Sequence, residues 1–94
     1  MSYQEVISAQ YGTYTVNDTN EAEKNALGIY IAEDTVIARI EVDGATATDV
    51  KANYISTPGT AIKAGTLITP QGGDDYFSAV TLTSGSVTLI LKDA

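Results

Sequence analysis

The side chains that could do chemistry in this sequence are carboxylates and phenols. The 94 residues include 12 Asp and Glu and six Tyr, but no His and no Cys. Without these two residue types the chain cannot build a Ser-His-Asp or Cys-His nucleophile system, and it lacks the commonest general base at neutral pH. It also contains neither a GxxxxGKS/T nor a GxGxxG phosphate-binding motif. We therefore predict that the protein is not an enzyme and holds no cofactor.

Two adjacent acid pairs are the candidates for a metal site. Asp74 and Asp75 follow Gly72-Gly73, and Ca²⁺ takes oxygen ligands from loops of this kind. The alternative is a solvated acidic turn before a strand, which we favour here and for Glu33-Asp34. A glycosidase needs two carboxyl groups at a set separation in a cleft, and twelve acids allow such pairs without specificity. The prediction is no metal site, with Asp74 and Asp75 as the positions to inspect.

The six tyrosines have two interpretations. A Tyr on an exposed β surface suits sugar stacking and protein interfaces, because it offers an apolar ring with a polar tip. The simpler interpretation is that these rings fill the core and the sheet edges. The composition favours the second interpretation without excluding the first.

Length and charge narrow the class of protein. Ninety-four residues make one domain, and without Cys no disulfide can support it. The net charge of −7, with only five Lys and Arg, argues against nucleic acid and against an anionic membrane surface as partners. No targeting segment or apolar run of about 18 residues is visible, so we expect synthesis and assembly in a cytoplasm.

The fold class follows from the β-branched residues. Val, Ile and Thr make up 29 of the 94 residues, and these residues fit a pleated, half-buried surface. We predict an all-β fold, a small antiparallel β-sandwich or barrel of about seven short strands. We expect at most one short helix, near Asn20–Leu27, where Asn20 and Glu23 have capping-box spacing. Residues 17–94 form a single compact β domain, preceded by an N-terminal arm or strand over residues 1–16.

Several strands and turns can be placed in advance. Two hairpins are expected, one over Gly28–Gly44 and one over Tyr76–Leu91 with its turn at Ser84-Gly85. Between them, Val50–Ile55 and Thr66–Thr69 are predicted as short strands.

The first 16 residues show no simple apolar period. They form either an integral strand or an arm that binds a partner, and both interpretations stay open. As an arm, this segment would add a strand to the sheet edge of a neighbouring molecule. The candidate contact residues are Tyr3, Val6, Ile7, Tyr11 and Tyr14.

The last two predicted strands are apolar on both faces. A small sheet has one core to offer, so a second apolar face implies a second burial surface. We predict that these side chains divide between an intrasubunit core and an oligomer interface. They are Phe77, Leu82, Val87, Leu89, Ile90 and Leu91.

The stretch Ala64–Leu91 resembles the C-terminal pattern of small tailed-bacteriophage virion proteins. The matching features are an Ala-Gly-Thr strand start, an aromatic before a strand, and a Leu-x-Ser-Gly-x-Val turn. They are carried by Ala64, Gly65, Thr66, Phe77, Leu82, Ser84, Gly85 and Val87. The resemblance covers about 28 residues and uses common turn chemistry.

This resemblance implies a non-enzymatic structural protein of the virion. It implies a capsid decoration (cement) protein, often a homotrimer, that stabilises the head shell by contacting the major capsid protein or another virion protein. The alternative is a tail-fibre or spike module that recognises a host glycan or protein.

Overall fold

The computed structural model describes residues 12–92 and confirms the all-β prediction. Six strands and one short helix follow in the order β1 (Thr13–Val16), β2 (Ala26–Ile31), β3 (Val36–Val42), α2 (Lys51–Tyr54), β4 (Leu67–Ile68), β5 (Phe77–Ser84) and β6 (Val87–Leu91). All strand pairs are antiparallel. No helix in the described part of the chain is long and apolar enough to cross a membrane.

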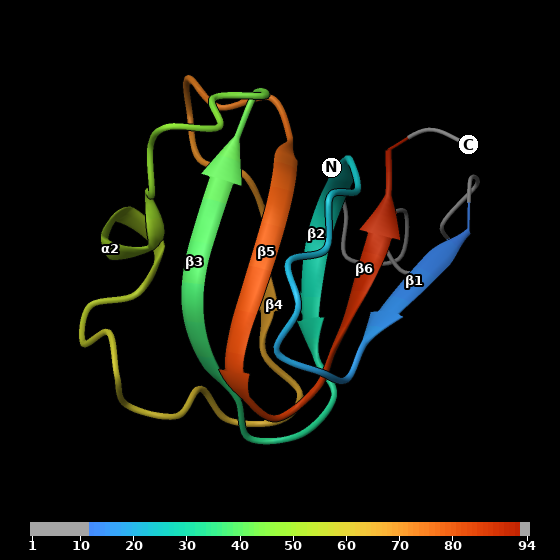
Figure 1. Cartoon of the computed structure of the whole chain (residues 1–94), viewed down its shortest axis with the longest axis vertical. Coiled ribbons are helices and arrows are strands. Elements are labelled where there is room, and N and C mark those ends of the chain that lie inside the picture. Colours follow the sequence, from blue (N-terminus) through green and yellow to red (C-terminus); the bar gives the residue numbers. More distant parts are fainter. Residues whose placement is uncertain (1–11, 93–94) are drawn as a thin grey trace.

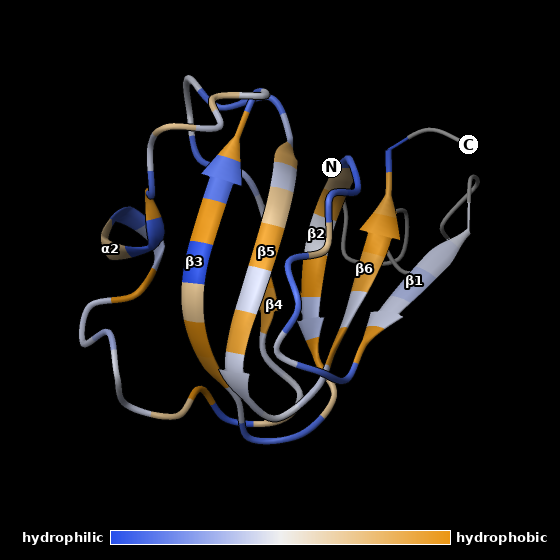
Figure 2. Ribbon diagram, in the orientation of Figure 1, coloured by the Kyte–Doolittle hydropathy of each residue, from blue (hydrophilic) through white to orange (hydrophobic). Residues whose placement is uncertain are grey.

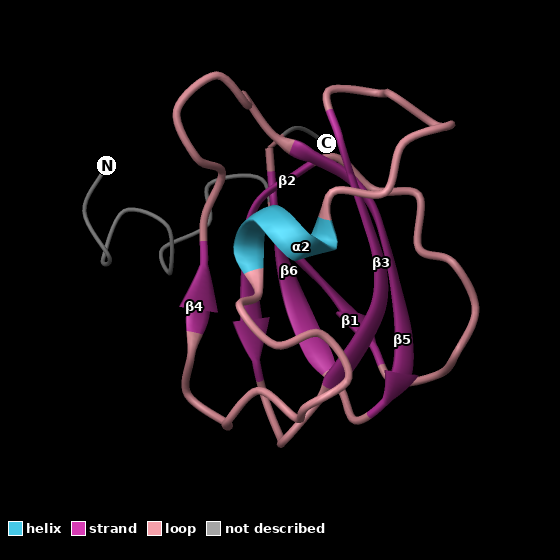
Figure 3. Ribbon diagram, turned by 90° about the vertical axis from the view of Figure 1, so that its left-hand side faces the viewer, coloured by secondary structure: helices cyan, strands magenta, loops and turns pink. Residues whose placement is uncertain are grey.

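The six strands form one sheet that bends into two layers. The order is β1-β6-β2-β5-β3, with β4 also pairing β2. Between β2 and β5 the only paired residues are Ala26 and Phe77, and the register of β2 shifts between Ala26 and Gly28. A shift of this kind lets a strand turn from one layer into the other. Figures 1 and 3 show β3 and β5 in one layer, facing the layer of β1, β2, β4 and β6.

The core fills the space between the two layers. Its largest fully buried side chains come from both, with Ile29 and Leu89 on one side and Ile40 and Leu82 on the other. Figure 2 shows the strongly apolar residues concentrated on β2, β3, β5 and β6, whereas β1 is pale along most of its length. The ring of Tyr54, from α2, packs edge-on against Phe77 with the ring centroids 5.2 Å apart. The short helix therefore closes one side of the core.

The two expected hairpins do not exist as paired strands. β2 pairs with β6 rather than β3, and β5 pairs with β3 rather than β6. The β2–β3 and β5–β6 connections instead cross between the layers, where Ser86 O accepts hydrogen bonds from Ala32 N and Glu33 N. The residues at these positions predict a turn, because turns depend on local sequence. Which strands then pair depends on how the apolar side chains of the two layers are buried.

The helix lies elsewhere than expected. Asn20–Leu27 is not helical, because Asp18 Oδ1 caps Asn20 N in a local turn and Ala22 pairs with Val80 of β5. The segment predicted as a strand over Val50–Ile55 contains α2 instead. In this helix Ala52 and Asn53 are exposed, whereas Val50 and Tyr54, four residues apart, pack against the core, as one face of a helical turn does.

Candidate functional site

The predicted interface residues of the C-terminal strands lie mainly inside one chain. Phe77, Leu82, Val87 and Leu89 belong to the central core. Leu91 is half-buried and packs against that core. Ile90 is only 3% exposed although it falls on the opposite face of β6 from Leu89. The apolar surface that suggested an oligomer is thus largely buried within the single chain.

The acidic loop is part of a hydrogen-bond network. Tyr54 Oη donates to Asp74 Oδ2 at 2.6 Å and accepts from Gln71 N at 2.9 Å. Burial, followed by the hydrogen bond to Asp74, raises the pKa of Tyr54 to about 12. Asp43 Oδ1 accepts from Asp75 N at 2.9 Å, so the loop is tied to the end of β3. Sequence reasoning missed these contacts because the partners lie 20 and 32 residues apart.

The same loop borders a hollow of about 300 Å³, which is lined by Leu27, Thr69, Pro70, Asp74 and Asp75. Within residues 12–92, no group of three or more His, Cys, Asp or Glu is arranged to hold a metal ion. The Asp74 carboxylate already holds the Tyr54 hydroxyl, which gives it a structural role in the loop.

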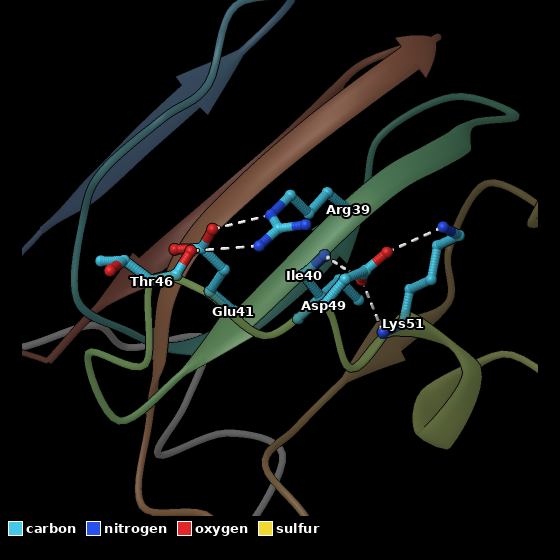
Figure 4. Close-up of polar contacts among 6 residues, drawn as sticks. All are labelled: Arg39, Ile40, Glu41, Thr46, Asp49 and Lys51. Atoms are coloured by element: carbon cyan, nitrogen blue, oxygen red, sulfur yellow. Dashed lines mark hydrogen bonds and ion pairs between the residues drawn. The ribbon is translucent and has the colours of Figure 1, made fainter.

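The free side of β3 is covered by the segment that follows it. Asp49 Oδ1 accepts from Ile40 N at 3.1 Å and from Lys51 N at 3.0 Å, as Figure 4 shows. Val50 N donates to Ile40 O at 2.8 Å. Nearer the start of β3, Thr35 and Ile62 form a two-way backbone bridge. These contacts satisfy backbone groups that an uncovered edge strand would offer to another chain.

Charged side chains also lie along the β3 edge. Arg39 Nε donates to Oε2 of the buried Glu41 at 2.7 Å, and Arg39 Nη2 donates to Thr46 O at 3.1 Å (Figure 4). Lys51 Nζ lies 2.8 Å from Asp49 Oδ2. The β3 side is consequently closed by both backbone contacts and charge.

The outer edge of β1 is the contrasting feature. Thr13, Tyr14 and Thr15 are all exposed, and among the strands of residues 12–92 β1 is the last on its side of the sheet. Leu91 N donates to Gly12 O at 3.0 Å, and β1 pairs Tyr14 with Leu89 and Val16 with Val87. Because antiparallel strands alternate their bonding direction, the N–H and C=O groups of Thr13 and Thr15 point away from β6.

Tyr14 adds an apolar side chain to this edge. It is 42% exposed and is the one large apolar side chain in the described residues that is exposed. Lys24 Nζ lies 5.1 Å from the centre of its ring, a cation–π contact. A small hollow of about 170 Å³ beside it is lined by Asp18, Asn20 and Glu21 among others. We take the outer edge of β1, meaning Thr13, Tyr14 and Thr15, as the candidate site.

The sequence pointed to part of this site. Tyr14 is one of the predicted arm residues, whereas Thr13 and Thr15 are not. Their signal is the uncharged run Thr13–Val16 immediately before a strongly polar stretch. The other arm residues, Tyr3, Val6, Ile7 and Tyr11, lie outside the described residues.

Comparison with known proteins adds no relative: no family model, no curated protein and no solved structure matches this chain.

Proposed function

We propose that this protein is a non-enzymatic structural component of a tailed-bacteriophage virion, a capsid decoration protein that stabilises the head shell. Its mechanism is mechanical. By burying surface where shell subunits meet, it favours the assembled state by mass action, since it binds that state and not the separated subunits.

One observation carries the proposal. Five of the eight residues on which the phage resemblance rests are core residues or glycines with a positive φ. Gly65 and Gly85 adopt positive φ angles of 93° and 90°, which glycine tolerates best. Phe77, Leu82 and Val87 are fully buried core residues. This supports an architectural role for the pattern.

Only one of the two arguments for the expected homotrimer remains. The apolar strands that suggested a shared threefold core are mainly covered within one chain, so a trimer rests on the resemblance alone. The proposed role needs a contact surface on the shell, and it does not need a particular number of copies in solution.

The proposal is tested by adding the purified protein to heads assembled without it. Decorated heads are expected to survive several degrees of additional heating, with saturation at a fixed number of copies per head. Failure to bind such heads would refute the decoration role.

The second candidate is a tail-fibre or spike module that binds a host glycan. It is favoured by the exposed Tyr14 ring next to a hollow lined by Asp18, Asn20 and Glu21. A sugar stacks on an aromatic ring while carboxylate and amide groups take its hydroxyls. Binding of glycans that is lost in Tyr14→Ala and kept in Tyr30→Ala would favour this candidate.

A further inference from the structure

We infer that the outer edge of β1 pairs with the same edge of a second copy of this chain, in an antiparallel contact around a twofold axis. The inference goes beyond the proposed function and does not depend on it. The observation behind it is a difference between the two edges of the sheet. The β3 edge is covered by Asp49, Val50 and Ile62, whereas β1 is exposed.

The backbone of β1 supplies the hydrogen bonds. Thr13 and Thr15 direct their N–H and C=O groups away from β6, as the pairing with Leu89 and Val87 requires. In a twofold contact Thr13 of one copy faces Thr15 of the other. Each of the two facing pairs exchanges two hydrogen bonds, so the seam holds four.

The side chains of β1 are self-complementary in the same register. The sequence Thr-Tyr-Thr reads identically in both directions about Tyr14. The twofold axis passes beside Tyr14, so the two Tyr14 residues meet directly opposite one another on one face, and the Thr side chains meet on the other. Aromatic pairs and Thr pairs are both favourable across antiparallel strands. The contact would also bury part of the Tyr14 surface, which is 42% exposed in the single chain.

The second copy fits this edge better than a charged partner strand does. Thr13–Val16 has no Lys, no Pro and no inward charge, and these are three of the devices that block edge pairing. The seam is short, and two chains of net charge −7 repel each other. Association is therefore expected to be weak and to strengthen with added salt, because screening reduces the repulsion.

The test is sedimentation of the full-length protein from about 10 μM to 1 mM, combined with amide hydrogen exchange by NMR. The mass is expected to rise from one chain toward two with concentration, and more steeply at higher salt. In parallel, the amides of Thr13 and Thr15 should gain protection with concentration, whereas those of Tyr14 and Val16 are protected throughout. The inference is wrong if the protein stays a monomer and the protection of the Thr13 and Thr15 amides does not change with concentration. It is also wrong if the mass approaches that of three chains.

A matched pair of variants locates the contact. Thr15→Pro removes an outward N–H while leaving the bonds between β1 and β6 in place, because proline is tolerated on the free side of an edge strand. It should weaken association at least tenfold, whereas Thr15→Val keeps the N–H and should associate like the unmodified protein. If Thr15→Pro does not fold, the association of Tyr14→Glu is compared with that of Tyr14→Phe. Tyr14→Glu should associate more weakly, since two Glu side chains opposite each other repel. Equal association of the two members of either folded pair would refute the contact.

Discussion

Gly85 lies directly against Thr35, at the point where the two connections between the sheet layers cross. A Cβ atom on Gly85 would collide with Thr35 Oγ1 and would stand 2.6 Å from Asp34 O and 2.7 Å from Thr35 Cα. The Thr35 hydroxyl is fully buried and lies 2.6 Å from Glu33 O and 3.1 Å from Ser86 O. The two crossing turns are therefore packed backbone against backbone, and they hold the layers at one end.

This contact predicts that Gly85→Ala is strongly destabilising. The positive φ of 90° costs an alanine about 1–2 kcal/mol, and the overlap with backbone atoms adds about 1–3 kcal/mol. Urea denaturation measures the loss. The control is Gly59→Ala, where φ is 98° but a Cβ meets nothing within 4 Å, so only the first cost applies. Equal losses in the two variants would contradict the packing.

Tyr54→Phe should remove an alkaline loss of stability. The pKa of Tyr54 is raised from 10.0 to about 12 in the folded chain, so the folded state holds the proton more tightly than the unfolded state. That stabilisation is complete below pH 10 and is lost as the pH rises toward 12. The variant should cost about 1–2 kcal/mol at pH 7, because Gln71 N and Asp74 lose a partner. The difference from the unmodified protein should shrink above pH 10, and a constant difference would refute the assignment.

Asp49→Asn should lower the free energy of unfolding more at neutral pH than at acid pH. Burial pushes the pKa of Asp49 up, but hydrogen bonds from Lys51 and Ile40 outweigh it, so the pKa lies below the usual value of 3.8. A depressed carboxylate stabilises the fold above its unfolded pKa, and this contribution is lost as the pH falls through the folded pKa. The free energy of unfolding of the two proteins should therefore differ at pH 7 and differ less at an acid pH below 3.8. Equal differences at both pH values would show that the charge of Asp49 is irrelevant.

Ile90→Asp should unfold the chain rather than separate subunits. Ile90 is 3% exposed within one chain, and burying an unpaired carboxylate costs several kcal/mol. The control is Thr88→Asp, two residues away on the same face of β6, where the side chain is half-buried. Circular dichroism should show loss of structure for Ile90→Asp and a native spectrum for Thr88→Asp. A folded Ile90→Asp monomer would instead place Ile90 at a subunit interface.

How far the sequence predicts the fold can be judged from individual turns. Asp43 and Gly44 stand at the end of the predicted hairpin segment Gly28–Gly44, and both have positive φ with Ala45 N bonded to Val42 O, as a tight turn requires. Ser84-Gly85 also marks a turn correctly. Its partner strand was predicted wrongly, because turn chemistry is local whereas β5 and β6 find their partners through burial in two different layers.

The candidate site shows the same division. Tyr14 could be selected from its residue type, but the outward direction of Thr13 and Thr15 depends on the register of β1 against β6. The cover on β3 was equally hidden, since it needs Asp49 and Ile40 to meet after a turn. Short-range patterns thus predict strands and turns, while edges and their protection become visible only with the topology.

The central proposal, a decoration protein of the phage head, is tested most directly by counting this chain in purified virions. Quantitative mass spectrometry against the major capsid protein gives the number of copies per particle. The account predicts hundreds of copies, in a fixed ratio to the capsid subunits. A few to some tens of copies would point to a tail fibre or spike, and absence from the particle would contradict the proposal altogether.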